Sequence, residues 1–238
     1  TRNITEGMGG YDTHPRFSPD GKRISWISME RDGYEADLKR LFVQDLKTGQ
    51  KTFLTDGFEY DVDELQWAAN SQSLFFLSTK HAEAQLWEIA LKGRKIRQIT
   101  TGMHDYTSLD VQGGKILAGR QSYIEPTDLY LVDVKTGAAK QLTAENKSTL
   151  DGLAPISVEK RWVKTTDGGN MLVWVVLPPS FDKTKKYPAL LFCQGGPQSP
   201  VSQFFSYRWN MRLMAEQGYI VIAPNRHGRS EERRVGKE

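Results

Sequence analysis

The chain repeats one pattern three times without gaps: LFVQDLKTGQKTFLT (41–55), LWEIALKGRKIRQIT (86–100) and LYLVDVKTGAAKQLT (129–143). Each copy reads as a strand, a turn that contains glycine, and a second strand that ends in Leu-Thr or Ile-Thr. The copies start 45 and then 43 residues apart, a spacing that is typical of propeller blades. The repeat therefore predicts a row of similar antiparallel units.

A second repeated element precedes each copy. PRFSPDGKRISWIS (15–28) aligns with LQWAANSQSLFFLS (65–78), and a weaker copy surrounds GGKILAG (113–119). An Asp-Gly or Asn-Ser turn there joins two alternating strands, which is hairpin chemistry. Each unit then has two hairpins, so residues 1–150 are predicted to form about three blades of a partial β-propeller. Propellers typically close with four to eight blades, and we expect further blades outside this segment.

The pattern changes after residue 150. RWVKTTDGGNMLVWVVLPPS (161–180) predicts a hairpin, and ALLFC (189–193) is a short apolar run of the kind buried on both faces of an α/β sheet. Cys193 in that run is interpreted as a small buried residue. YIVIAPN (219–225) is a second buried strand. The intervening helix is predicted from a four-residue periodicity and a following glycine: Phe205, Trp209, Leu213 and Gly218. Residues 151–228 are therefore predicted to begin an open α/β domain with a βαβ unit.

The loop CQGGPQSP (193–200) lies between that strand and that helix. Ligands of such sheets bind beyond the carboxyl ends of the strands. Glycines there leave backbone N–H groups uncovered, so that they can donate to a developing oxyanion, and prolines fix the loop. Without context the motif reads better as a simple tight turn.

Two charged loops interrupt the blades, SMERDGYEAD (28–37) and DGFEYDVDE (56–64). Both are interpreted first as solvated surface, with Glu30 and Arg31 as weak candidates for contacting a substrate. The second loop lacks the glycine and the terminal Glu spacing of a calcium loop.

The composition, with 38% hydrophobic and 26% charged residues, is that of a globular protein. Its longest apolar run, 171–179, is too short to span a bilayer. The net charge of +3 favours neither a nucleic acid nor a membrane as partner. Histidine and cysteine show no metal-ligand spacing, so no metal or other cofactor is predicted.

A family resemblance rests on the order of three motifs after the blades: WVKTTDG (162–168), KKYPALLFCQGGPQSP (185–200) and GYIVIAPNRHG (218–228). Over residues 1–228 the chain resembles the prolyl oligopeptidase family of serine peptidases, and within it the bacterial dipeptidyl-peptidase V and acylaminoacyl-peptidase group. The resemblance implies that residues 151–228 are the N-terminal part of an α/β-hydrolase domain. It also implies a peptide substrate and a bacterial protein, either periplasmic or cytoplasmic.

The resemblance assigns roles to individual residues. The loop usually reads His-Gly-Gly-Pro in this group, and Gln194 replaces the histidine here. An oxyanion donor is implied at Gly196, with Gly195 beside it. Arg226 is implied to face the substrate, or else to pair with a local carboxylate or carbonyl, and Gln198 is a weak further candidate for substrate binding.

The catalytic triad of the family is missing from the sequence. No Gly-x-Ser-x-Gly motif occurs, and His227 precedes any nucleophile although the order in such domains is Ser, acid, His. The chain is therefore predicted to be inactive by itself. The intact protein is expected to be an exopeptidase or oligopeptidase of dipeptidyl or acylaminoacyl type, with oligomerisation left open.

Two alternatives remain at this point, a non-catalytic propeller that binds partners and, more weakly, a lipase or esterase. The charged tail RSEERRVGKE (229–238) continues no earlier pattern and resembles a translated sequencing adapter, so it is predicted to be non-native. Open strand edges should make the isolated chain aggregate or oligomerise.

Overall fold

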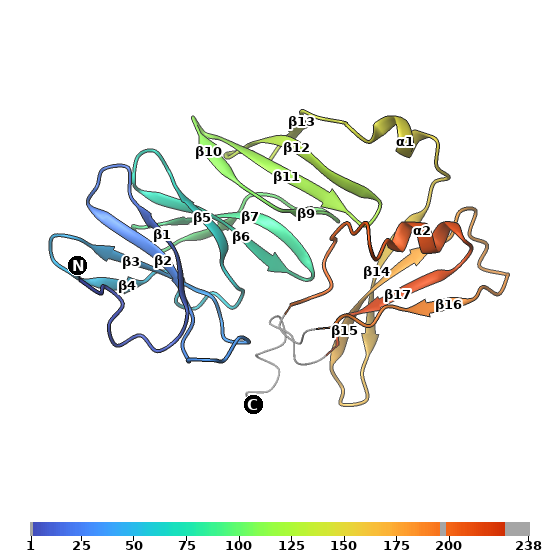
Figure 1. Cartoon of the computed structure of the whole chain (residues 1–238), viewed down its shortest axis with the longest axis horizontal. Helices are drawn as coiled ribbons and strands as arrows, with labels where there is room; N and C mark the ends of the chain where they lie inside the picture. Colours follow the sequence, from blue (N-terminus) through green and yellow to red (C-terminus); the bar gives the residue numbers. More distant parts are fainter. Residues whose placement is uncertain (1, 196–198, 227–238) are drawn as a thin grey trace.

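A computed structural model of the chain describes residues 2–195 and 199–226. These residues form four β-sheets and two short helices (Figure 1). The first three sheets follow one another from the N-terminus, and the fourth lies beside the third (Figure 1). The tail at 229–238, predicted to be non-native, lies outside the described residues.

The first two sheets are antiparallel and follow the chain order, β1-β2-β3-β4 and β5-β6-β7-β8. Each is one of the predicted pairs of hairpins. Their strands are β1 (Asp12–Phe17), β2 (Arg23–Ser28), β3 (Arg40–Asp45), β4 (Lys51–Phe53), β5 (Asp63–Trp67), β6 (Ser73–Lys80), β7 (Glu83–Ala90) and β8 (Ile96–Gln98).

The third sheet has the order β10-β11-β12-β13, and a short additional strand, β9, pairs with β11. The segment around GGKILAG thus forms a hairpin like its two clearer copies. The strands of this sheet are β9 (Asp105–Tyr106), β10 (Asp110–Gln112), β11 (Lys115–Ser122), β12 (Glu125–Asp133) and β13 (Ala139–Gln141). A five-residue helix, α1 (Lys147–Asp151), follows it.

One hydrogen bond explains why each repeat ends in threonine. The hydroxyl of that Thr accepts a hydrogen bond from the backbone N–H of the Leu that begins the repeat. This bond closes the outer hairpin of the sheet. The three bonds are Leu41 to Thr55 at 3.0 Å, Leu86 to Thr100 at 3.0 Å and Leu129 to Thr143 at 2.9 Å. The sequence repeat is therefore a repeat of specific contacts as well as of strands.

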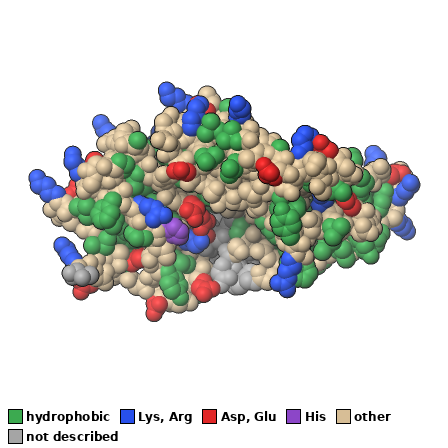
Figure 2. Space-filling view, turned by 45° about the horizontal axis from the view of Figure 1, so that its top comes forward, with side chains coloured by type: hydrophobic (Ala, Val, Ile, Leu, Met, Phe, Trp, Pro, Cys, Tyr) green, Lys and Arg blue, Asp and Glu red, His purple; other side chains and the backbone are tan. Residues whose placement is uncertain are grey.

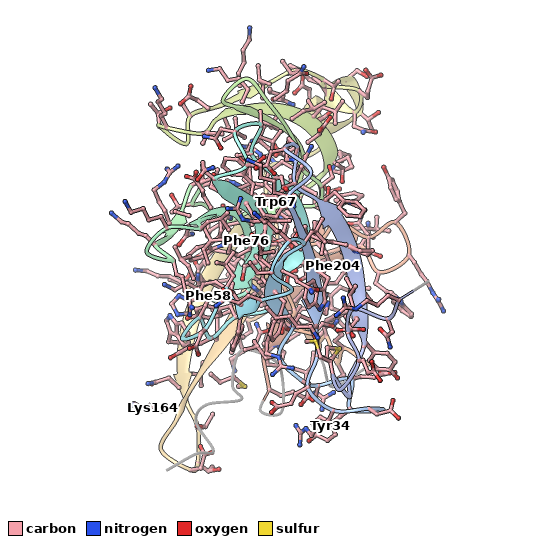
Figure 3. The ribbon with its side chains drawn as sticks, turned by 90° about the vertical axis from the view of Figure 1, so that its left-hand side faces the viewer. Tyr34, Phe58, Trp67, Phe76, Lys164 and Phe204 are labelled. Atoms are coloured by element: carbon pink, nitrogen blue, oxygen red, sulfur yellow. The ribbon has the colours of Figure 1, made fainter. Side chains whose placement is uncertain are left out.

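Neighbouring sheets pack face to face through apolar side chains. Leu41 and Val43 of the first sheet share a buried cluster with Phe76 and Trp87 of the second. Figure 3 shows Phe58 and Phe76 in this interior, where their ring centroids lie 5.8 Å apart. A second cluster joins the second sheet to the third in the same way. This stacking is the packing expected of consecutive blades.

The fourth sheet has the order β14-β15-β17-β16, with β16 at its edge. The first two pairings are antiparallel, and β16 pairs with β17 in parallel. Helix α2 lies in the connection between those two parallel strands. The bounds are β14 (Ser157–Lys164), β15 (Asn170–Leu177), β16 (Ala189–Leu191), α2 (Met211–Glu216) and β17 (Ile220–Pro224).

Across the described ranges, 2–195 and 199–226, the chain is therefore mostly antiparallel β structure. The fourth sheet, with one parallel pair and one short helix, does not amount to an α/β-hydrolase domain. The sequence predicts the N-terminal part of an α/β-hydrolase domain, and this sheet by itself does not establish one.

Two details of the prediction for this half are wrong. The apolar run ALLFC is not buried on both faces: Leu191 is 63% exposed and Cys193 is exposed as well. The reason is that β16 is an edge strand with no described neighbour on its outer side. The helix is also shorter than its periodicity indicates, since Phe205 and Trp209 precede it. Asn210 begins it instead, because its Oδ1 accepts the N–H of Leu213 at 2.9 Å.

Two long hairpins connect the blades to the fourth sheet. The β6–β7 hairpin turns at His81 and Ala82, and the β11–β12 hairpin turns at Tyr123 and Ile124. Ala82 and Tyr123 share a buried cluster with Trp174 of β15, so one core extends across both parts. No described helix is long and apolar enough to cross a membrane.

Candidate functional site

The glycine loop, defined here as residues 193–200, starts beyond the carboxyl end of β16. Phe192 still belongs to the sheet, since its N–H donates to the carbonyl of Ile222 at 2.8 Å. Parallel strands end at the same edge, so the loop meets the residues that follow β17. There Nη2 of Arg226 donates to the carbonyl oxygen of Gln194 at 3.3 Å. The structure thus brings the predicted Arg226 to the predicted loop, and it gives this side chain a carbonyl partner.

The chain returns from the glycine loop through residues 201–204, which we call the return limb. The fourth sheet holds this limb by three hydrogen bonds at Val201. Trp174 Nε1 donates to the Val201 carbonyl at 2.9 Å, and the Val201 N–H donates to Asn225 Oδ1 at 2.7 Å. Asn225 Nδ2 also donates to the same carbonyl, at 3.3 Å. Because Val201, Trp174 and Asn225 are all buried, these bonds are shielded from competing water.

On its propeller side the return limb contacts a buried carboxylate, that of Asp105 on β9. This carboxylate accepts hydrogen bonds from three donors: the backbone N–H of Ala84 at 2.8 Å, the hydroxyl of Ser202 and the backbone N–H of Gln203. Burial raises the pKa of Asp105 to about 6, and these hydrogen bonds oppose the rise. The Tyr123 N–H adds a bond to Gln203 Oε1 at 3.4 Å.

A cavity of about 560 Å³ opens beside the glycine loop. Its walls combine the loop with apolar side chains of the return limb and of the helix region. The residues that line it are Leu190, Leu191, Phe192, Cys193, Gln194, Gly195, Phe204, Trp209, Met214 and Val221. The backbone of the loop therefore faces a mostly apolar space, which strengthens any hydrogen bond formed there.

The predicted oxyanion residues are only partly described. Gly195 has open space where a side chain would begin, with no atom within 4 Å of an added Cβ. It is also absent from the described glycines with positive φ, so neither sterics nor backbone conformation demands glycine at that position. Gly196 and Gln198 lie outside the described residues, as does His227.

Glu30 and Arg31 lie on the loop between β2 and β3. Arg31 is fixed within that loop, because its guanidinium pairs with Asp37 and lies 3.8 Å from the ring centroid of Tyr34. Glu30 has a largely exposed side chain, 3.7 Å from Arg40 Nη1. Tyr34 lies at the rim of the molecule in Figure 3. In the described part of the chain, no hydrogen bond or ion pair joins Glu30 or Arg31 to the glycine loop.

The face of the molecule in Figure 2 shows no single dominant charge. On the face in Figure 2, acidic and basic side chains alternate with hydrophobic ones. No group of three or more His, Cys, Asp or Glu side chains in the described ranges could hold a metal ion. The described part of the site combines backbone groups, amides, Arg226 and apolar side chains, with the buried Asp105 carboxylate behind the return limb.

Sequence reasoning missed the residues that hold the loop. Asn225 carried a usable signal, because it is a polar residue directly after a buried strand in YIVIAPN. Asp105 carried none, since HDY (104–106) resembles an ordinary charged turn. Its role depends on a contact with residues almost a hundred positions later, which no local pattern encodes.

Comparison with known proteins gives a consistent result. A model of the dipeptidyl peptidase IV N-terminal region matches residues 10–118. The chain is 67% identical to dipeptidyl-peptidase 5 of Porphyromonas gingivalis over 228 residues, which are 96% of this chain and 33% of that protein. It is 59% identical to dipeptidyl-peptidase 5 of Porphyromonas endodontalis, with the same coverage. The chain thus spans about a third of the length of these curated relatives.

Solved structures share the fold at low sequence identity. Acylaminoacyl peptidase of Pyrococcus horikoshii matches 89% of this chain with a TM-score of 0.74 and 22% identity, over 32% of its own chain. Dipeptidyl peptidase 4 of Porphyromonas gingivalis matches 90% with a TM-score of 0.66 and 20% identity, over 30% of its chain. Over nearly its whole length the chain is thus similar to dipeptidyl-peptidase 5 sequences, and residues 10–118 match the dipeptidyl peptidase IV N-terminal region.

Proposed function

We propose that the protein of which this chain is a part is a serine peptidase that releases dipeptides from the free N-termini of short peptides. The observation that carries this proposal is the 67% identity to a dipeptidyl-peptidase 5 over nearly the whole chain. Release of acylated residues is the second candidate, because the fold is shared with acylaminoacyl peptidases. Both reactions are acyl transfers to a serine and then to water.

The fourth sheet is proposed to be the start of the catalytic α/β-hydrolase domain. Its strand order supports this, because β16 and β17 are parallel and are joined through α2. The free outer edge of β16 and the exposed Leu191 also suit pairing with a further strand. On this proposal residues 1–150 are propeller, 151–228 belong to the catalytic domain, and 229–238 are a non-native tail.

The glycine loop is proposed to stabilise the tetrahedral intermediate. A carbonyl under attack gains negative charge on its oxygen, and backbone N–H groups held in advance stabilise that charge. Gly196, with Gly195 beside it, would supply one donor, and the residue after the nucleophile would supply the other. The sequence contains no Gly-x-Ser-x-Gly motif, so the chain by itself is proposed to lack the triad and to be inactive.

Arg226 and Gln198 are proposed to line the substrate side of the loop. The hydrogen bond from Arg226 to the Gln194 carbonyl supports a position at the mouth of the cavity. Glu30 and Arg31, on the loop between β2 and β3, remain candidates for contacting a substrate from the propeller. The propeller would then limit the size of the peptides that reach the loop.

The test uses the full-length protein. Its hydrolysis of chromogenic dipeptidyl amides with a free amino terminus is compared with hydrolysis of the same amides carrying an N-acetyl group, and a serine-directed phosphonate serves as inhibitor. We expect activity on the free dipeptides that the phosphonate abolishes, and none from the 238-residue chain. Preference for acetylated substrates would favour the acylaminoacyl reaction. Absence of hydrolysis for both would overturn the peptidase proposal and leave a propeller that binds partners.

A further inference from the structure

The return limb is attached to two parts of the molecule at once. On one side Trp174 and Asn225 hold Val201 to the fourth sheet. On the other side Asp105 accepts hydrogen bonds from Ser202 and Gln203, the next two residues along the limb. Val201, Ser202 and Gln203 begin six positions after Gly195, the last described glycine of the loop, and are thus held from opposite sides.

Asp105 is itself held rigidly by the blades. It pairs with Gln121 in the β9–β11 ladder, and it accepts the N–H of Ala84 at the beginning of β7. Its side chain is almost fully buried, with 3% of the residue exposed. A carboxylate in such a place is stabilised only when several donors satisfy its oxygens, and here two of the three donors come from the return limb.

We propose that Asp105 is a positioning residue that fixes the return limb, and through it the glycine loop, to the second and third blades of the propeller. This inference rests on the proposed function, because it gives the loop its role in oxyanion stabilisation. Its new content is that a propeller residue, remote from the reacting atoms, sets the geometry of a loop in the other part of the chain.

A carboxylate fits this task better than an amide. Its two oxygens can accept all three hydrogen bonds, whereas Asn offers one acceptor oxygen and turns its NH2 group toward other donors. The backbone N–H of Gln203 or of Ala84 would then be left without a partner in a buried place. Asp105→Asn should therefore loosen the limb although it changes little in size.

Glu83 provides a matched control within the same interface. It lies on β7 next to Ala84, and its carboxylate pairs with Lys160 of β14 at 3.2 Å. It therefore also joins the blades to the fourth sheet, but at a strand and away from the return limb. Glu83→Gln neutralises a neighbouring carboxylate without removing an acceptor from Ser202 or Gln203.

The experiment compares Asp105→Asn and Glu83→Gln in the full-length protein by hydrogen exchange at one neutral pH. We expect the backbone amides of residues 201–205 to exchange about tenfold faster in Asp105→Asn than in wild type, and to be unchanged in Glu83→Gln. Equal exchange of these amides in the two variants would overturn the proposal. Asp105→Ala removes both acceptor oxygens, so it should speed the exchange of these amides more than Asp105→Asn does. If Asp105→Ala does not fold, the comparison of Asp105→Asn with Glu83→Gln decides the question.

A kinetic measurement separates positioning from simple destabilisation. Rates on a dipeptidyl amide are expressed per active site titrated with the phosphonate, so unfolded enzyme does not count. Asp105→Asn should lower kcat by about tenfold or more with KM within about twofold, because misplaced donors weaken transition-state binding most. Unchanged kcat in an active enzyme would refute the positioning role. A wild-type protein without activity would instead overturn the proposed function, and the exchange comparison would still decide whether Asp105 holds the limb.

Discussion

Asn225 and Val201 exchange two hydrogen bonds, from the Val201 N–H to Asn225 Oδ1 at 2.7 Å and from Asn225 Nδ2 to the Val201 carbonyl at 3.3 Å. The side-chain amide of Asn225 thus gives the backbone of the return limb one donor and one acceptor, as the backbone of a neighbouring strand would. Because Asn225 follows β17 and precedes Arg226, this pair ties the carboxyl end of one parallel strand to the loop that leaves the other.

Replacing this amide should be costly. Asn225→Ala removes two of the three hydrogen bonds at Val201 and leaves its buried N–H unsatisfied, so we expect a loss of about 2 kcal/mol in the free energy of unfolding. The measurement is the urea unfolding midpoint of the full-length variant, which should be lower than that of the wild type. Asn146→Ala is the control, because the Asn146 side chain makes no capping hydrogen bond at α1. Equal midpoints for the two variants would contradict the structural role of Asn225.

The titration of Asp105 predicts a pH dependence of stability. Its pKa is about 6 in the folded protein and near the ordinary aspartate value of 3.8 when the chain is unfolded. The folded protein therefore keeps the proton more tightly, and this contribution to stability is complete below the unfolded pKa and lost as the pH rises through about 6. Desolvation is the main cause. Nearby Glu83 adds to the rise, and the bonds from Ser202, Ala84 and Gln203 oppose it.

The measurement compares the unfolding free energies of wild type and Asp105→Asn across this range. Because two pKa units correspond to about 3 kcal/mol, the stability of wild type relative to the variant should fall by about that amount between pH 4 and pH 7. A constant difference between the two proteins would mean that Asp105 does not titrate in this interval.

Arg212 of α2 makes a further contact between the blades and the fourth sheet. Its guanidinium donates to the carbonyl of Ile124 at 3.3 Å and to that of Ala154 at 3.1 Å, and it pairs with Glu216 at 2.8 Å. Arg212→Met should destabilise the full-length protein by about 3 kcal/mol, since Glu216 would lose its partner in a largely buried position. Arg208→Met, at an exposed arginine, should be nearly neutral. Thermal unfolding midpoints of the two variants test this prediction, and equal midpoints would contradict it.

The blades could be predicted from sequence because their contacts repeat with it. Thr55, Thr100 and Thr143 each close an outer hairpin, so one physical requirement recurs at one spacing. The burial of β16 was mispredicted for the opposite reason: an apolar run does not reveal whether its strand lies inside a sheet or at an edge. Likewise, Asp105 and Gln203 meet only after both parts have folded. The contact of Asp105 with the return limb could therefore not be read from local patterns, whereas Asn225, a polar residue directly after a buried strand, could have been singled out.

One prediction uses the repeat as its own control. Gly49 and Gly137 occupy the same position in the outer turns of the first and third blades, with φ of +75° and +72°. An added Cβ at Gly137 would lie 2.2 Å from the Ile99 carbonyl oxygen, which belongs to the neighbouring blade, whereas at Gly49 the nearest atom is Gln44 Nε2 at 3.8 Å.

Both alanine variants should therefore share the conformational cost of about 1 kcal/mol for a positive φ. Gly137→Ala should lose about 2 kcal/mol more, because a backbone carbonyl must move to relieve the contact. Urea unfolding of the full-length variants measures this difference directly. A similar loss for both would show that the third blade stands further from Ile99 than this packing requires, and the blades would then be less tightly stacked at this turn.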